Sequence, residues 1–162
     1  MVPGAIPRSL REAATGDIET LIDALLAAAN WNGTERQSRE QVRANKYVEG
    51  WPRTTDFGVV AEDEYHLPLG AAWCRFFEEH DSGYGFVASD VPELTIGVAS
   101  KARGQGAGTA LMQALIVLAD DRGCRAVSLS VEYGNAARRL HERTGFVIVG
   151  RNGGSDTLLR ER

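Results

Sequence analysis

The stretch that decides the fold is a glycine-rich run, Arg103-Gly104-Gln105-Gly106-Ala107-Gly108-Thr109. It follows a strand-like segment over residues 93–98 and leads into a segment whose apolar side chains recur at helical spacing. Backbone N–H groups at the start of a helix, with no side chains in the way, form a site for phosphate oxygens, and the helix dipole strengthens the attraction. The run therefore predicts a phosphate-binding turn, with a tight turn that binds no ligand as the alternative.

Two common nucleotide-binding patterns do not fit this turn. The dinucleotide pattern GxGxxG needs a third glycine where Thr109 stands. It also needs an acidic residue at the end of a second strand about twenty positions on, whereas Asp120 and Asp121 still belong to the predicted helix. The Walker A pattern needs Gly-Lys-Ser/Thr, which does not occur here. What remains is Arg-x-x-Gly-x-Gly after a strand.

The chain on either side of the turn predicts a mixed α/β domain. Downstream, residues 124–131 alternate as a strand, 135–143 form a short helix, and 146–149 with 157–159 form a closing hairpin around Asn152-Gly153. The strand–helix–strand order predicts a βαβ crossover. Upstream, the pattern predicts strand, helix, helix, strand and strand over residues 9–13, 17–26, 35–48, 57–61 and 69–77.

Residues 78–92 form an irregular connection between these two halves. The segment contains Gly83, Gly85 and Pro92 and shows neither helical nor strand periodicity. Long connections in compact domains are often functional. We therefore expect this segment to contribute to a substrate site.

Composition narrows the class of protein. The 162 residues are 43% hydrophobic and 25% charged, which suits one globular domain. An excess of 22 acidic over 18 basic residues gives a net charge of −4 and argues against nucleic acid or an anionic membrane as a partner. Cys74 and Cys124 show no CxxC or His spacing that suits zinc, so we expect buried thiols and no metal. No apolar run approaches the ~20 residues of a membrane helix, and a cytoplasmic location is expected.

Three motifs in fixed order resemble the GCN5-related N-acetyltransferase (GNAT) superfamily. They are the strand with its glycine turn and helix, the strand over 127–131, and the segment Asn135-Ala136-Ala137-Arg138-Arg139-Leu140-His141-Glu142-Arg143-Thr144-Gly145-Phe146. The last is similar to the family's Asn…Leu-Tyr-Glu-x-x-Gly-Phe ending. The match covers about residues 93–149. It implies one GNAT domain over 1–162, with a six- to seven-stranded, mostly antiparallel sheet, about four helices and a V-shaped split at the acyl-CoA site.

The resemblance also implies how acetyl-CoA is held. The backbone of the strand before the turn would pair with the pantetheine arm, and the amides of the turn would hold the pyrophosphate. Asn135 is the nearest match to the family's pantetheine contact, and an arginine of the last helix would reach the 3′-phosphate. The cofactor residues expected on this basis are Ile96, Gly97, Val98, Arg103, Gly104, Gln105, Gly106, Ala107, Gly108, Thr109, Asn135 and Arg138.

The sequence offers alternatives for the acid and for the base of the reaction. His141 stands where the family usually has a tyrosine that protonates the departing thiolate, and it is either a proton donor or a histidine on a helix surface. An attacking ammonium must lose a proton, and the candidate bases are Glu93 and Glu132, with Glu78 or Glu79 as further options. The two cysteines have no evident partner base, so direct transfer is expected rather than a covalent intermediate.

The leading hypothesis is an enzyme that transfers an acetyl group from acetyl-CoA to the amine of a small molecule or a peptide. Because the usual tyrosine is replaced, a non-catalytic module that binds or senses acyl-CoA is the alternative, and a structural domain with an unused glycine turn is a weaker one. A homodimer is an expectation at the level of the family.

Overall fold

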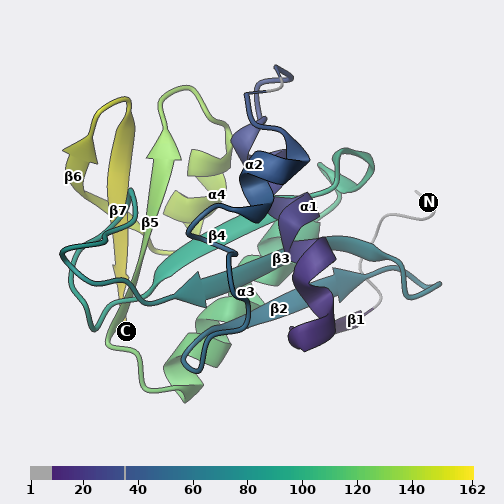
Figure 1. Cartoon of the computed structure of the whole chain (residues 1–162), viewed down its shortest axis with the longest axis horizontal. Coiled ribbons are helices and arrows are strands. Elements are labelled where there is room, and N and C mark those ends of the chain that lie inside the picture. Colours follow the sequence, from purple (N-terminus) through teal and green to yellow (C-terminus); the bar gives the residue numbers. More distant parts are fainter. Residues whose placement is uncertain (1–8, 35) are drawn as a thin grey trace.

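The computed structural model describes residues 9–34 and 36–162, and within them seven strands form one sheet in the order β1-β2-β3-β4-β5-β7-β6 (Figure 1). Neighbouring strands are antiparallel except for β4 and β5, which are parallel. The predicted mixed, mostly antiparallel sheet is thereby confirmed. The strands are β1 (Ser9–Glu12), β2 (Phe57–Glu62), β3 (Pro68–Arg75), β4 (Glu93–Val98), β5 (Ala126–Glu132), β6 (Val147–Asn152) and β7 (Ser155–Glu161).

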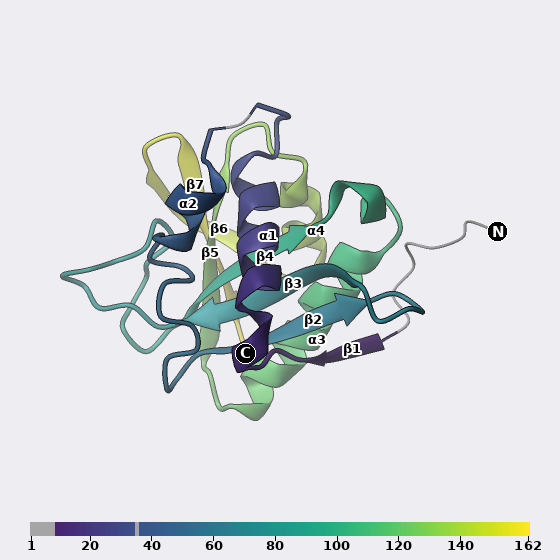
Figure 2. The ribbon, with the colours of Figure 1, turned by 45° about the vertical axis from the view of Figure 1, so that its right-hand side comes forward.

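The four α-helices of the described residues are α1 (Ile18–Ala29), α2 (Arg39–Arg43), α3 (Ala107–Asp121) and α4 (Ala137–Arg143). Figure 2 shows α1 in front of β3 and β4, with α3 behind the sheet. Side chains on a strand alternate between faces, and β2 shows it directly: Phe57 and Val59 belong to the hydrophobic cluster of α3, whereas Val60 belongs to the cluster of α1. Around β2 and β3 the sheet is therefore covered by apolar packing on both faces.

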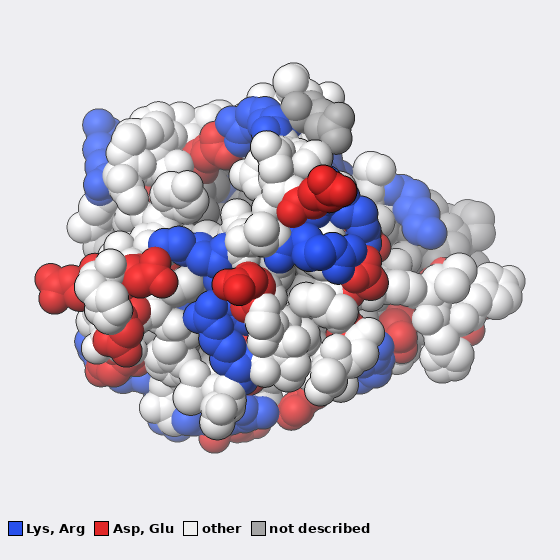
Figure 3. Space-filling view, in the orientation of Figure 1, with Lys and Arg blue, Asp and Glu red and all other residues white. Residues whose placement is uncertain are grey.

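The second helix differs from its prediction over residues 35–48. Only Arg39–Arg43 is helical, beginning with a capping box in which the Ser38 hydroxyl accepts the N–H of Gln41. Val42 is its buried residue, and Arg39 and Arg43 both pair with Glu19 of α1, so charges of both signs lie side by side where the two helices meet (Figure 3). After Ala44 the chain runs through turns instead, because long-range contacts from β3 hold this segment, as described below.

Helix α1 lies unusually close to strand β4. A Cβ atom at Gly97 would lie 1.8 Å from the carbonyl oxygen of Ala24, so only glycine lets the helix lie this close to the strand. The C-terminal end of α1 is thereby placed over the second half of β4. No helix of the described part of the chain is long and apolar enough to cross a membrane.

Candidate active site

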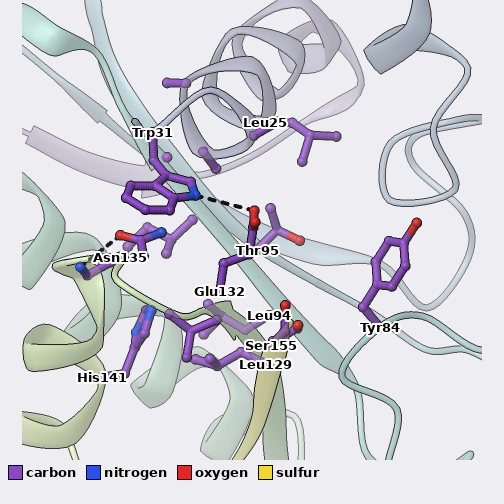
Figure 4. Close-up of a pocket in the computed structure, with 18 of the residues that line it drawn as sticks. Leu25, Trp31, Tyr84, Leu94, Thr95, Leu129, Glu132, Asn135, His141 and Ser155 are labelled. Carbon is purple, nitrogen blue, oxygen red and sulfur yellow. Dashed lines mark hydrogen bonds between the residues drawn. The ribbon is translucent and has the colours of Figure 1, made fainter. Parts of the chain in front are cut away.

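β4 and β5 begin side by side and then separate. Glu93 is in register with Ser128, and the N–H of Ser128 donates to the Pro92 carbonyl at 3.0 Å. In the described strands no later residue pair joins them, and a cleft of about 1350 Å³ opens between them (Figure 4). Ordinary ligand pockets have volumes of roughly 300–1,000 Å³, so this cleft has room for a cofactor arm and a second substrate.

The backbone of β4 presents free amides to this cleft. The N–H of Ala99 donates to the Leu69 carbonyl of β3, and hydrogen-bonded pairs alternate along antiparallel strands. The N–H groups of Val98 and Ile96 therefore point away from β3, toward the side where β5 has separated. These amides are suited to pair with an extended ligand or to stabilise an oxyanion.

The glycine turn has the geometry expected of a phosphate site. Gly104 and Gly106 have φ angles of +74° and +89°, a left-handed conformation that glycine adopts without strain. Gly106 is the N-cap of α3, so the positive end of a 15-residue helix faces the turn. Arg103 donates to the Ala27 carbonyl of α1 at 3.4 Å, which links the turn to the opposite wall.

The expected cofactor residues divide into two groups. Those that line the cleft are Ile96, Gly97, Val98, Arg103, Gly104, Gly108 and Asn135, and those that do not are Gln105, Gly106, Ala107, Thr109 and Arg138. The second group includes Arg138, whose guanidinium is paired with Asp156 at 2.8 Å. Asn135 accepts the Ala137 N–H through its side-chain oxygen at 3.0 Å, so its amide nitrogen remains to contact a ligand. The individual cofactor contacts stay predictions.

Glu93 is a buried carboxylate at the point where the strands separate. It is 2% exposed and lines the cleft, and burial raises the pKa of its carboxyl group. Oε1 accepts the Gly85 N–H at 2.5 Å and the Tyr47 hydroxyl at 3.2 Å. Oε2 is buried without a hydrogen-bond partner among the described residues. A carboxylate in this setting binds a proton more readily than one in water.

Glu132, the other predicted base, is engaged in an ion pair. Its carboxylate accepts from Arg36 Nη1 at 2.9 Å and from the indole N–H of Trp31 at 3.3 Å (Figure 4). The hydrogen bond from Arg36 is the main reason why the pKa of Glu132 is lowered. These contacts join the loop after α1 to the end of β5, and they leave Glu132 a weaker base than Glu93.

His141 lies in the wall of the cleft and not on a free helix surface. It is 4% exposed, its ring packs edge-on against Phe146, and burial lowers its pKa to about 4. Nδ1 is buried and has no partner within the described ranges. The ring is therefore neutral at pH 7 and has one N–H to donate.

Sequence reasoning missed two aromatic residues of the site, Tyr47 and Tyr84. Tyr47, Tyr84 and Trp31 all line the cleft, with Trp31 and Tyr84 visible on opposite sides in Figure 4. No local pattern identifies them, because each lies outside the regular elements. The two glycines of the segment 78–92 were the available signal, since both lie against Glu93.

Comparison of this sequence with known proteins identifies the family to which the chain belongs. The family model described as "Acetyltransferase (GNAT) family" matches residues 22–146. An L-methionine sulfoximine/L-methionine sulfone acetyltransferase from Pseudomonas paraeruginosa is 32% identical over 153 residues, which cover 88% of this chain and 81% of that protein.

Solved structures agree on the architecture. A ribosomal-protein-alanine N-acetyltransferase from Brucella melitensis superposes with a TM-score of 0.70 at 27% identity, covering 95% of this chain and 99% of that one. A putative acetyltransferase from Salmonella typhimurium, solved with its cofactor acetyl-CoA, has a TM-score of 0.67 at 22% identity and covers 94% and 92%. The expectation of an acetyl-CoA-dependent enzyme is confirmed, and the chain belongs to the GNAT family of N-acetyltransferases.

Proposed function

We propose that this N-acetyltransferase acetylates the amino group of a small, amino-acid-like acceptor by direct attack on acetyl-CoA, with Glu93 as the general base. The observation that carries the proposal is the position of Glu93. It is the buried carboxylate at the junction of β4 and β5, in the same cleft as the glycine turn and His141.

Glu93 suits the proton transfer that the reaction needs. An alkylammonium with a pKa near 10.4 is mostly charged at neutral pH and must lose a proton before it attacks the thioester carbon. Burial raises the pKa of Glu93 and so strengthens it as a base, whereas the Arg36 pair weakens Glu132. The amine proton passes to Glu93 directly or through one water.

The remaining groups fit the later steps. As the amine nitrogen bonds to the carbonyl carbon, negative charge develops on the thioester oxygen, and the outward-pointing N–H of Val98 is suited to stabilise it. When the carbon–sulfur bond breaks, the thiolate of coenzyme A leaves and the acetyl group stays on the amine nitrogen. That nitrogen loses its second proton as the amide forms, and the thiolate takes up one proton, directly or through water. The single N–H of His141 would donate a hydrogen bond to that sulfur.

The acceptor class rests on the relative and on two contacts at the rim of the cleft. The protein that is 32% identical is named for acetylating two methionine derivatives. In this chain the Asn152 side chain donates to the Tyr84 carbonyl at 3.1 Å, which joins the β6–β7 turn to the segment 78–92. The pair Arg36–Glu132 joins the loop after α1 to the end of β5. These links favour a small acceptor over an extended peptide.

A panel of amines tests the acceptor class. With acetyl-CoA, thiol release should be fastest with methionine sulfone, methionine sulfoximine or related free amino acids. It should be much slower with a peptide that begins with alanine and with a polyamine. Preferential turnover of the peptide would overturn the assignment to small acceptors.

The base is tested by one substitution. Glu93→Gln keeps the size of the side chain but cannot accept the proton, so we expect turnover to fall by roughly 10²–10⁴-fold, the usual contribution of a positioned base. Acetyl-CoA affinity, measured by calorimetry, should be nearly unchanged. Glu132→Gln is the matched control and should lose much less. A parent-like rate in Glu93→Gln would show that another group takes the proton.

A further inference from the structure

The phenol of Tyr47 connects Glu93 to the segment that covers it. Its oxygen accepts the Tyr84 N–H at 2.8 Å and lies 3.2 Å from Oε1 of Glu93. A hydroxyl has one proton, and an N–H can only donate. The phenolic proton therefore points at Glu93, and because burial raises the pKa of Tyr47 the group keeps that proton at every working pH.

This arrangement makes the two oxygens of Glu93 unequal. Oε1 accepts from both the phenol and the Gly85 N–H, whereas Oε2 has no partner in the described part of the chain. A Cβ atom at Gly83 would lie 1.8 Å from Oε2, so the glycine leaves just enough room for the carboxylate. Two donors on one oxygen leave the other as the oxygen that can take a proton.

The backbone of Tyr47 is itself fixed from the sheet. The indole N–H of Trp73 on β3 donates to the Tyr47 carbonyl at 2.9 Å. Arg75, also on β3, donates to the carbonyls of Lys46 and Glu49 at 2.8 Å each, and its charge is balanced by the buried Asp56. Such contacts hold an irregular segment in one conformation. The phenol of Tyr47 is therefore held rigidly against Glu93.

We infer that Tyr47 is a positioning residue for catalysis, which orients Glu93 by occupying Oε1 so that Oε2 receives the proton of the acceptor amine. The inference rests on the proposed role of Glu93 as the base and adds the residue that sets its orientation and basicity.

Other charged and titratable groups also face Glu93. From the segment after α2 these are Lys46, whose positive charge favours the carboxylate, and Tyr47. The covering segment contributes the N–H of Gly85 and, more weakly, the backbone of Gly83, and both favour the charged carboxylate. Lys46 is tied to that segment through Asp81 at 3.0 Å and the Ser82 carbonyl at 2.8 Å. Glu132 and His141 line the same cleft. A hydrogen bond to a carboxylate stabilises its charged form, so its loss raises the pKa of Glu93 further.

Tyr47→Phe is the direct test, with two readouts. In a ¹³C NMR titration of side-chain carboxyl groups, with the Glu93 signal assigned by its loss in Glu93→Gln, the pKa of Glu93 should be higher in the variant. In kinetics at saturating acetyl-CoA, the acid limb of kcat/KM for the acceptor should move to higher pH. At pH values below the pKa of Glu93 we expect kcat/KM to fall by about tenfold, because the lost interaction is a hydrogen bond to a charged group. The value should return toward that of the parent as the pH rises.

Three further variants separate the possible explanations. Tyr65→Phe removes an exposed phenol from the β2–β3 turn and should leave both readouts unchanged. Gly83→Ala displaces the carboxylate, so it should lower kcat/KM at every pH without recovery. Glu93→Gln tests the base itself.

The outcomes are distinct. An unchanged Glu93 titration in folded Tyr47→Phe, or a loss that is equal at every pH, would overturn the role of Tyr47. If Glu93→Gln keeps the parent's pH profile, the proposed base fails, while the NMR titration still decides whether Tyr47 controls the carboxylate.

Discussion

His141 occupies the position where a tyrosine is usual in the family, and its surroundings determine what it can do there. Burial lowers its pKa to about 4, so an imidazolium is not the form present at pH 7. A neutral imidazole still donates one hydrogen bond, as a phenol would. As the thiolate forms, this hydrogen bond stabilises its negative charge, while the proton that the sulfur takes up comes from the amine nitrogen or from water. The replacement therefore keeps a hydrogen-bond donor at this position without supplying an acidic proton.

A hydrogen bond from His141 to the thiolate predicts that removing the side chain slows the chemical step. His141→Ala should lower kcat by roughly 10–10²-fold, because a hydrogen bond to a charged group contributes about 1.5–3 kcal/mol, while the KM for acetyl-CoA changes little. His141→Tyr should restore most of the rate because the phenol supplies the donor. Steady-state thiol release with a good acceptor measures both. If His141→Ala turns over like the parent, the solvent protonates the thiolate and the histidine only fills the wall of the cleft.

Among the elements, α3 offers a matched pair of glycines at its two ends. Gly106 and Gly123 have φ angles of +89° and +79°, and a Cβ atom at either position would meet open space, with no atom beyond its chain neighbours within 4 Å. Valine at either site carries the same kind of backbone strain, but only Gly106 belongs to the turn that faces the cofactor. We expect Gly106→Val to weaken acetyl-CoA binding at least tenfold, about 1.4 kcal/mol, and Gly123→Val to leave it unchanged.

Calorimetry on the two folded variants makes this comparison, with thermal denaturation to confirm similar stability. An affinity like the parent's in both variants would show that the turn does not hold the pyrophosphate. Equal losses would show that backbone strain, and not contact with the ligand, lowers the affinity.

The elements also differ in how far sequence can predict them. The strand, turn and helix from Glu93 to Asp121 were predicted closely, because periodicity and glycine placement are local signals. The segment after Ala44 was not, because carbonyl contacts from Arg75 and Trp73 shape it across a large sequence distance. Glu93 could be proposed as a base from its place on a strand, but the loop that buries it could not be foreseen. The orienting phenol was beyond prediction for the same reason.

At the scale of the whole molecule, the cleft lies where the two halves of the sheet meet. β1 to β4 form one half and β5 to β7 the other, and a single residue pair, Glu93 with Ser128, joins them in register. A common apolar cluster nevertheless links the halves, with Leu111 of α3 packed among residues such as Phe57 of β2 and Leu129 of β5. This shared packing predicts that the halves unfold together.

Acetyl-CoA should therefore stabilise the molecule as one unit. A ligand that binds only the folded state at 100 times its Kd adds about 2.7 kcal/mol, and each kcal/mol shifts Tm by roughly 2–4 °C at this size. We expect calorimetric melting to remain a single transition and to rise by roughly 5–11 °C at that concentration. Gly106→Val at the same acetyl-CoA concentration should show at most about half that rise, because a tenfold higher Kd leaves about 1.4 kcal/mol of stabilisation. Two transitions, of which the ligand moves only one, would contradict the shared core, since then the strands on one side of the cleft would melt independently of the other side.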